Sequence, residues 1–310
     1  MDEFELIRRY FDRPVTSPGA TQGVVKGIGD DGAVLMPTAG FELVQVIDSL
    51  VEGVHFLADA DPSDIGYRVV AVNLSDIAAM GARPRWMTLA LTLSGQDPHW
   101  VEQFAAGLHT AADEFDVVLV GGDTTSGAAV VATVAITGEV EQGKALLRSG
   151  AQVGDAIFVS GSVGDAAAGL QLLSRKAQDN FLTARFCRPT ARIHLGRELS
   201  GRASAVIDIS DGLVGDLKKL LVASEVGAEI DVDRLPLSDA LRQRFSADEQ
   251  RNFALTGGDD YELCFTADPD RVKDIAGVTA IGVVTGGQDL VCMQDGNIVD
   301  YDDSGYRHFQ

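Results

Sequence analysis

Hydrophobic and polar positions follow two periods along the chain, and each period predicts one kind of element. Apolar residues three or four positions apart indicate helices, whereas continuous or alternating apolar runs indicate strands. In the first half the pattern predicts helices at 3–11, 62–81 and 98–115, and strands at 43–48, 86–93, 117–120 and 129–137. A segment rich in glycine and proline, residues 14–29, separates the first helix from the first strand and is typical of a loop.

The pattern restarts after the polar, turn-rich segment 148–155. It predicts strands at 156–160, 204–209, 228–232, 261–266, 279–284 and 289–293, and helices at 164–174, 190–201, 212–226, 238–245 and 269–276. Helices and strands alternate in both halves, so we predict α/β architecture for each. A chain of 310 residues fits two domains of ordinary size, which we place at 1–145 and 146–310.

Composition narrows the class of protein. With 45% hydrophobic and 23% charged residues, the chain is expected to fold into globular domains. Cys187, Cys264 and Cys292 are far apart and form no C-x-x-C pair, so neither a disulfide framework nor a zinc knuckle is predicted. We therefore expect the three cysteines to fill the core in a reducing compartment.

The net charge excludes some partners. Asp and Glu number 46 against 25 Lys and Arg, and the resulting charge of −21 argues against nucleic acid and anionic membranes. The acidic start of the chain does not fit a signal peptide, and no apolar run reaches membrane-spanning length. We expect a cytoplasmic protein. The same acidity suits a site that handles polyphosphates through divalent cations.

Aspartates recur where strands end or where glycine precedes them. In α/β sheets the carboxyl ends of strands form the ligand crevice, so carboxylates there tend to converge. Mutual repulsion then favours a bound cation, and Mg²⁺ prefers such scattered oxygen ligands. The alternative for each aspartate is an ordinary role in a turn or a helix cap. This alternative fits Asp76 least, because Asp76 shares one helix face with Asn73, and it also fits the Asp208–Asp211 pair poorly. The aspartates concerned are Asp30, Asp31, Asp48, Asp76, Asp123, Asp208, Asp211, Asp259 and Asp260.

Other phosphate and metal motifs are absent or ambiguous. Gly143-Lys144 is followed by alanine, which excludes a P-loop, and the five histidines show no zinc spacing. The glycine-rich turn at 160–169 either binds phosphate at a helix N-terminus or simply packs a helix on a strand. His55, just beyond a predicted strand, is a candidate ligand contact or a structural residue.

Six motifs in this order resemble the thiamine-monophosphate kinase family. The family belongs to the aminoimidazole-ribonucleotide-synthetase-like superfamily, with selenophosphate synthetase and hydrogenase maturation proteins. The similarity covers nearly the whole chain. The motifs are 27–31 (GIGDD), 48–56 (DSLVEGVHF), 72–82 (VNLSDIAAMGA), 121–125 (GGDTT), 209–213 (ISDGL) and 257–263 (GGDDYEL).

The resemblance implies mixed sheets and a homodimer, in which N-terminal domains that bind ATP and Mg²⁺ pair through their sheets into a β-barrel. It also implies the reaction, in which ATP phosphorylates thiamine monophosphate to thiamine diphosphate by direct in-line transfer assisted by several Mg²⁺ ions, without a dedicated catalytic base. By the same resemblance, Gly122, Asp123, Arg148 and Ser210 are expected to contact the nucleotide, and His55, Asp259 and Tyr306 the thiamine substrate. The expected metal ligands are Asp30, Asp31, Ile47, Asp48, Asp76, Asp123, Asp208 and Asp211.

Two departures from the family pattern bear on the site. Val46-Ile47 replaces a Ser/Thr pair before Asp48, so only the Ile47 carbonyl remains as a ligand there. Asp259 replaces a glutamate and shortens the expected substrate contact by one methylene.

Two alternative functions follow from the same motifs. One is another ATP-dependent synthetase of the superfamily, although the cysteines that two of its members would need near either terminus are missing. The other is a regulator that binds nucleotide or thiamine without turnover.

Overall fold

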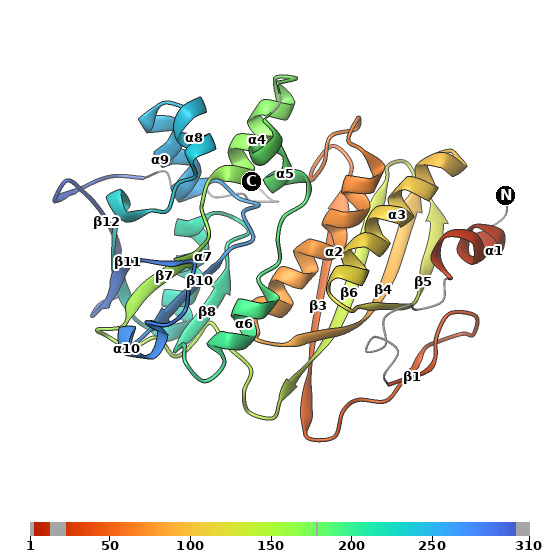
Figure 1. The fold of residues 1–310 in the computed structure, drawn as a ribbon, viewed down its shortest axis with the longest axis horizontal. Coiled ribbons are helices and arrows are strands. Elements are labelled where there is room, and N and C mark those ends of the chain that lie inside the picture. The colour runs from red at the N-terminus through yellow and green to blue at the C-terminus, as the bar shows by residue number, and fades with distance from the viewer. Residues whose placement is uncertain (1–2, 13–22, 178, 302–310) are drawn as a thin grey trace. The chain divides into compact units, whose positions relative to one another are not determined.

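A computed structural model describes residues 3–12, 23–177 and 179–301 of the chain (Figure 1). The contacts divide it into two compact units. Unit 1 comprises Met1–Ile77 and Ala82–Gly143, and unit 2 comprises Ala78–Gly81 and Lys144–Gln310. Each unit combines helices with a mixed sheet, which confirms the predicted two-domain α/β architecture.

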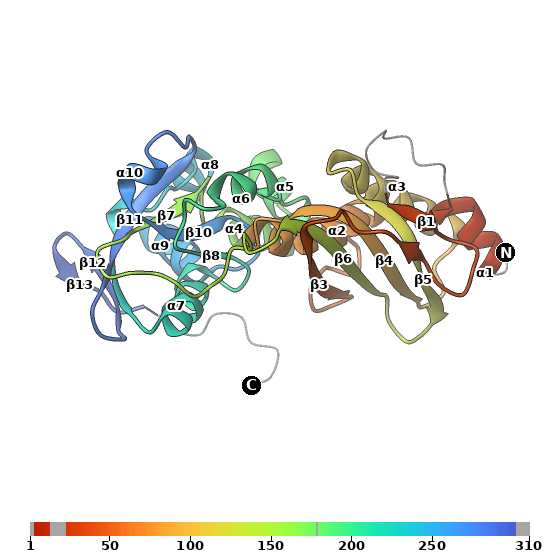
Figure 2. The ribbon, with the colours of Figure 1, turned by 90° about the horizontal axis from the view of Figure 1, so that it is seen from below.

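Unit 1 contains a four-stranded sheet in the order β3-β6-β4-β5. The strands are β3 (Phe41–Val51), β4 (Arg83–Leu93), β5 (Val118–Ser126) and β6 (Val131–Glu141). Only β4 and β5 run parallel to each other. Two long helices, α2 (Pro62–Ala79) and α3 (Pro98–Glu114), lie on the same side of the sheet (Figure 2).

Burial along the strands shows which face the helices cover. On β3, Val44 and Leu50 are buried while Leu43 and Ile47 are exposed, as expected when successive side chains point to opposite faces. The exposed face of the sheet therefore carries apolar side chains.

Smaller elements complete unit 1. The hairpin of β1 (Val24–Lys26) and β2 (Val34–Leu35) packs Val24 and Leu35 against Trp86 and Val118. The first predicted helix is a short α1 (Glu3–Leu6) followed by a π-helical turn over Ile7–Phe11.

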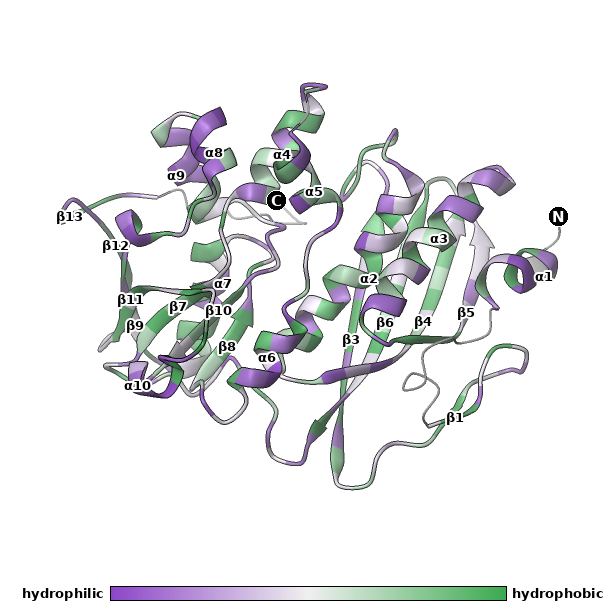
Figure 3. Cartoon of the chain, viewed as in Figure 1, coloured by the Kyte–Doolittle hydropathy of each residue, from purple (hydrophilic) through white to green (hydrophobic). Residues whose placement is uncertain are grey.

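Unit 2 is built on a seven-stranded sheet in the order β13-β12-β9-β11-β7-β10-β8. Its strands are β7 (Ala156–Ser160), β8 (Ala205–Asp208), β9 (Gly227–Asp231), β10 (Leu263–Ala267), β11 (Val278–Thr285), β12 (Leu290–Gln294) and β13 (Asn297–Ile298). Only β9 and β12 are parallel. Figure 3 shows these strands as mostly hydrophobic.

The helices of unit 2 differ in part from the predicted ones. They are α4 (Asp165–Ser174), α5 (Asn180–Cys187), α6 (Ile193–Leu199), α7 (Leu213–Ser224), α8 (Asp239–Arg244), α9 (Ala247–Thr256) and α10 (Pro269–Val272). The sequence pattern did not predict α5 and α9, and it placed the start of α6 at residue 190, whereas the helix begins at Ile193. Pro189 explains why α5 ends at Cys187, because the residue before a proline disfavours helical geometry.

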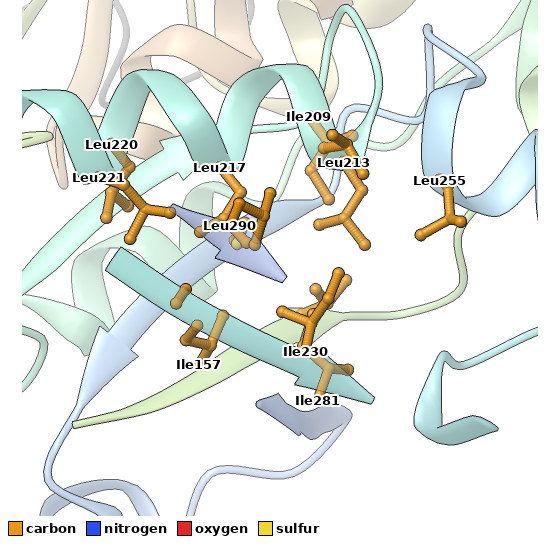
Figure 4. Close-up of a cluster of buried hydrophobic side chains, with 14 of the residues drawn as sticks. Ile157, Ile209, Leu213, Leu217, Leu220, Leu221, Ile230, Leu255, Ile281 and Leu290 are labelled. Carbon is orange, nitrogen blue, oxygen red and sulfur yellow. The ribbon is translucent and has the colours of Figure 1, made fainter. Parts of the chain in front are cut away.

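The main core of unit 2 lies between α7 and the sheet. Figure 4 shows leucines of α7, among them Leu213 and Leu217, directed toward Ile157, Ile230 and Ile281 of the strands. All five side chains are buried. The N-terminal end of α7 is thereby fixed on the sheet, next to the end of β8.

Residues Ala78–Gly81 belong to unit 2, although Ala78 and Ala79 are the last two residues of helix α2. Ala78 and Ala79 share a buried cluster with Leu199 and Phe265. Gly196 of α6 lies so close that a Cβ there would come 2.0 Å from the Ala78 carbonyl oxygen.

Candidate functional site

Two loops of unit 2 meet where β8 ends and β10 begins. Asp208 at the end of β8 lies opposite Leu263 at the start of β10. The Tyr261 and Asp259 amides donate to the Ile209 and Ser210 carbonyls at 2.8 Å each. The pairing brings the predicted residues Asp208, Ser210 and Asp211 together with Asp259. We call the two segments the serine loop (209–212) and the glycine loop (257–262).

The glycine loop requires glycine and left-handed backbone. A Cβ at Gly258 would lie 2.6 Å from the Ser210 carbonyl oxygen, so only glycine permits this approach. Asp259 and Tyr261 have φ of 71° and 52°, a conformation that costs side-chain-bearing residues free energy and persists where surrounding contacts enforce it. The Tyr261 hydroxyl donates to Asp259 Oδ1 at 3.1 Å. The glycine loop therefore holds Asp259 in one defined position.

A buried carboxylate supports the serine loop from below. Asp216 of α7 is 1% exposed, and its Oδ2 accepts from the amides of Ser210 and Asp211 at 2.9 Å each. The Lys219 ammonium lies 2.7 Å from Asp216 Oδ1 and 2.6 Å from Asp211 Oδ2. Burial raises the pKa of Asp216, and the hydrogen bond from Lys219 opposes that rise. Lys219 therefore pairs with both carboxylates and links the serine loop to α7.

A second buried carboxylate anchors the end of the glycine loop. Glu262 is fully buried and accepts from Ser160, Arg185 and Arg192. The two guanidinium groups come from α5 and from the residue that precedes α6. The Glu262 backbone carbonyl also accepts from the Ile209 amide at 2.8 Å, which links Glu262 to the serine loop.

The glycine-rich turn at 160–169 is occupied by a carboxyl group of the protein itself. Asp260, fully buried, accepts from the amides of Gly164 at 2.5 Å and Ala166 at 3.1 Å, at the N-terminal end of α4. These amides are the groups that a phosphate would use. Of the two readings of this turn, the structure thus favours packing. Burial raises the pKa of Asp260 to about 7, against the opposing effect of the Gly164 amide and the Arg185 charge.

In unit 1, Asp30 and Asp31 lie in the loop that joins β1 and β2. Asp30 Oδ1 accepts from the Asp31 amide at 3.0 Å, and Lys26 lies 3.7 Å from Asp30 Oδ2. A Cβ at Gly27 would be 4.0 Å from the Val120 carbonyl oxygen, so this loop starts beside β5, the strand that carries Gly122 and Asp123.

The expectation that Asp48 ends a strand is wrong, whereas Asp123 follows glycine as the sequence indicates. Asp123 lies inside β5, beside Ala90 of β4, and Asp48 lies inside β3, beside Val134 of β6. The pattern located β3 at 43–48, but its pairing with β6 continues to Val51. The rule applied best to parallel sheets, and most pairs here are antiparallel.

Strand alternation puts the unit 1 candidates on different faces. Asp48 shares the helix-covered face with Val44 and Leu50, whereas the Ile47 side chain is 66% exposed on the other face. A role for Ile47 in metal binding thus rests on its carbonyl, as expected. Asp76 is half-buried near the end of α2, and Asn73, one turn earlier, is fully buried and donates to the Val69 carbonyl at 2.8 Å.

The remaining candidates lie at separate positions. His55 is half-buried in the turn after β3, where its Nδ1 accepts from the Val51 amide at 3.1 Å, so a neutral ring carries its proton on Nε2. The Arg148 carbonyl accepts from Ser224 at the C-terminal end of α7, whereas Ser210 lies at the N-terminal end. Tyr306 lies outside the described residues.

The described residues contain no preassembled metal site and no membrane-spanning helix. Within them no group of three or more His, Cys, Asp or Glu side chains is arranged to hold a metal ion. No helix in this part of the chain is long and apolar enough to cross a membrane.

Sequence reasoning missed the residues that support the loops. Asp216, Arg185, Arg192 and Glu262 were not singled out, although all four make buried or half-buried charged contacts. Glu262 could have been found from the sequence, because it stands between Tyr261 and the apolar start of β10, and an ionisable group in a buried segment needs a partner.

Comparison with known proteins agrees with the motifs. Two family models match the chain: AIR synthase related protein, N-terminal domain, over residues 29–140, and the corresponding C-terminal domain over residues 152–294. The thiamine-monophosphate kinase of Escherichia coli K12 is 45% identical over 99% of this chain and 98% of its own length. That of Bacillus subtilis is 37% identical over 86% of this chain and 83% of its own.

Solved structures give the same result. The thiamine-monophosphate kinase of Stenotrophomonas maltophilia K279a has a TM-score of 0.83 at 43% identity, covering 90% of this chain and 93% of its own. The structure of AaThiL complexed with AMPPCP and TMP has a TM-score of 0.81 at 35% identity, with 92% of both chains covered. Taken with the two domain matches, these similarities show that the chain belongs to the thiamine-monophosphate kinase family of the AIR synthase-related proteins.

Proposed function

We propose that the chain phosphorylates thiamine monophosphate with ATP to give thiamine diphosphate and ADP. The observation that carries this proposal is the 45% identity to the E. coli kinase over nearly the full length of both chains. The relative complexed with AMPPCP and TMP supports the same pair of ligands.

The chemistry asks for alignment and charge neutralisation. An oxygen of the acceptor phosphate attacks the γ-phosphorus of ATP as the bond to the β-phosphate oxygen breaks, and ADP leaves. A phosphate monoester has its second pKa near 6, so the acceptor is already an anionic nucleophile at neutral pH. No protein base is needed, and we propose direct transfer without a phosphoenzyme.

The glycine and serine loops of unit 2 fit this task. The half-buried Asp259 is proposed to contact the thiamine substrate, and Ser210 the nucleotide. The two loops are hydrogen-bonded through the Asp259 amide and the Ser210 carbonyl, so donor and acceptor contacts are held in fixed register. His55, Tyr306, Gly122, Asp123 and Arg148 are the further contacts that we propose.

Mg²⁺ suits the donor set of the proposed metal ligands. These are aspartate carboxylates and one backbone carbonyl, the oxygen ligands that Mg²⁺ prefers. The Lys219 ammonium, 2.6 Å from Asp211, occupies a position where a cation is favoured. Asp208 and Asp211 of unit 2, and Asp30, Asp31, Ile47, Asp48, Asp76 and Asp123 of unit 1, would hold the ions. When bound, Mg²⁺ would neutralise phosphate charge.

The exposed face of the unit 1 sheet supports a homodimer. Leu43 is 53% and Ile47 66% exposed there, while the opposite face is covered by helices. We propose that residues 1–145 bind ATP and Mg²⁺ and pair with a second copy into a barrel, and that residues 146–310 form the second domain. Leu43→Lys should then shift the mass measured by light scattering from dimer to monomer, and an unchanged mass would count against this face.

A coupled assay of ADP release tests the reaction. With Mg²⁺ and ATP we expect ADP and thiamine diphosphate from the monophosphate and no turnover with free thiamine. Mass spectrometry identifies the product. ADP release that is independent of both acceptors would point to another synthetase, and tight ATP binding without any release would point to a regulator.

A further inference from the structure

The buried Glu262 has a contact pattern that packing alone does not require. Its Oε1 accepts from Arg185 Nη2 at 2.9 Å and from Arg192 Nη2 at 2.5 Å. Its Oε2 accepts from Arg192 Nε at 2.6 Å and from the Ser160 hydroxyl at 2.5 Å. Every one of these bonds needs an acceptor, so both carboxylate oxygens of Glu262 are used.

Glu262 cannot touch a substrate, because its side chain is fully buried. Gly161 closes the space beside it: a Cβ there would come 2.3 Å from Glu262 Oε1. Any effect of the Glu262 carboxylate on ligands must therefore act through the position of the backbone segment that carries it. That segment is the glycine loop.

Two alternate residues anchor the glycine loop inside unit 2. Asp260 and Glu262 are anchored inside unit 2, the first by the Gly164 and Ala166 amides and the second by the two arginines. The buried Tyr261 lies between them and the half-buried Asp259 precedes them, both with left-handed backbone. Fixed points on alternate residues leave the Asp259 carboxylate little freedom.

We infer that Glu262, held by Arg185 and Arg192, is a positioning residue for the glycine loop and sets where Asp259 meets the thiamine substrate. This inference rests on the proposed function. The adjacent serine loop has its own support in Asp216, so the two loops are held by different buried carboxylates. Disturbing one anchor should affect mainly the ligand of its own loop.

Glu262→Gln is the direct test. An amide oxygen can replace only one carboxylate oxygen, and the NH₂ group then faces donors. Steady-state kinetics should show at least a tenfold higher KM for thiamine monophosphate, with kcat within threefold of wild type. A loss of binding that is equal in the ground state and the transition state produces this combination. The rise in KM for ATP should be at least fivefold smaller.

Arg192→Lys is the second variant, for the case that Glu262→Gln does not fold. It keeps the positive charge but loses the paired Nε and Nη2 contacts, and its site is partly exposed, with 31% of the side chain accessible. We expect the same selective rise in KM for thiamine monophosphate, smaller than for Glu262→Gln.

Two matched controls separate positioning from general stability. Asp216→Asn removes a buried carboxylate of the same unit and should raise the Mg²⁺ or ATP concentration required more than the KM for thiamine monophosphate. Asp274→Asn removes the partner of Arg202 in an exposed pair and should leave all constants unchanged. Thermal unfolding of each variant records stability independently.

The outcomes distinguish the two proposals. Wild-type chain that makes no thiamine diphosphate would refute the proposed function and, with it, this inference. If wild type is active, a selective rise in KM for the acceptor in the folded variant supports positioning. Equal changes for both substrates, or a lower melting temperature with unchanged constants, would show Glu262 to be structural only.

Discussion

Helices α2 and α3 cross at two glycines, and adding one methyl group there should destabilise unit 1. A Cβ at Gly107 of α3 would lie 1.8 Å from the Ser63 carbonyl oxygen, and one at Gly66 of α2 would lie 2.0 Å from that of Phe104. Ordinary van der Waals contact needs 3.4–4 Å. The opposing atoms belong to backbone, so neither helix can yield by a change of rotamer.

The magnitude follows from two opposing effects. Alanine is favoured over glycine inside a helix by about 1 kcal/mol. Overpacking of a closed interface costs about 1–3 kcal/mol, occasionally more, and a clash between backbones belongs at the upper end. We expect Gly107→Ala to lower the free energy of unfolding of unit 1 by about 2 kcal/mol.

Gly215→Ala is the matched control. Gly215 lies within α7, and a Cβ there would meet no atom within 4 Å. The same substitution should therefore raise stability, by up to about 1 kcal/mol. Opposite signs for one chemical change would isolate the effect of the helix crossing.

Urea unfolding measures both effects. The two tryptophans, Trp86 and Trp100, belong to unit 1, so their fluorescence reports the unfolding of that unit, while circular dichroism follows both units. A Gly107→Ala protein with a midpoint equal to or above that of wild type would refute the close crossing. A destabilised Gly215→Ala would refute the balance of effects on which the magnitude rests.

Three further predictions follow from the site and the core. Burial raises the pKa of Asp260 to about 7 from 3.8, so the native state binds the proton more tightly than the unfolded state, and the free energy of unfolding should fall by up to about 1.4 kcal/mol per pH unit as pH rises from about 4 to 7. Asp260→Asn should flatten that slope when unfolding is measured across pH. An unaltered slope in the variant would contradict the raised pKa. Asp76→Asn should abolish thiamine diphosphate formation without loss of fold, as the coupled assay and circular dichroism can check, and retained turnover would remove Asp76 from the proposed metal ligands. Burial raises the pKa of Cys264 to about 12, so a thiol reagent should label it only after unfolding, and rapid labelling of the native protein, mapped by mass spectrometry, would argue against its buried position.

The sequence predicted the architecture well because local periodicity decides it. The alternation of apolar runs identified β7, β8, β9 and β10 to within two residues at each end, and the switch of pattern separated two α/β halves. The predicted ends of elements were wrong where pairing with another strand determines the end. Strand β3 continues to Val51 because β6 pairs with it, and no local signal marks that end.

The candidate site was only partly visible for a similar reason. Motifs and turn chemistry pointed to Ser210, Asp211 and Asp259, which the pairing of β8 with β10 does bring together. The carboxylates that support them are defined by burial, and burial depends on helices distant in sequence. Arg185 and Glu262 are 77 positions apart, so no spacing rule connects them.

Helix α2 ends in a stretch that serves the other unit, and this limits how the chain can be divided. A fragment starting at Lys144 would lack Ala78 and Ala79, which fill the cluster around Leu199 and Phe265. Exchange of the C-terminal half with that of a relative would have to match these four residues, Ala78–Gly81, or leave a cavity. Recombination between members of the family is therefore constrained by Ala78–Gly81, which is synthesised well before the C-terminal half that packs against it.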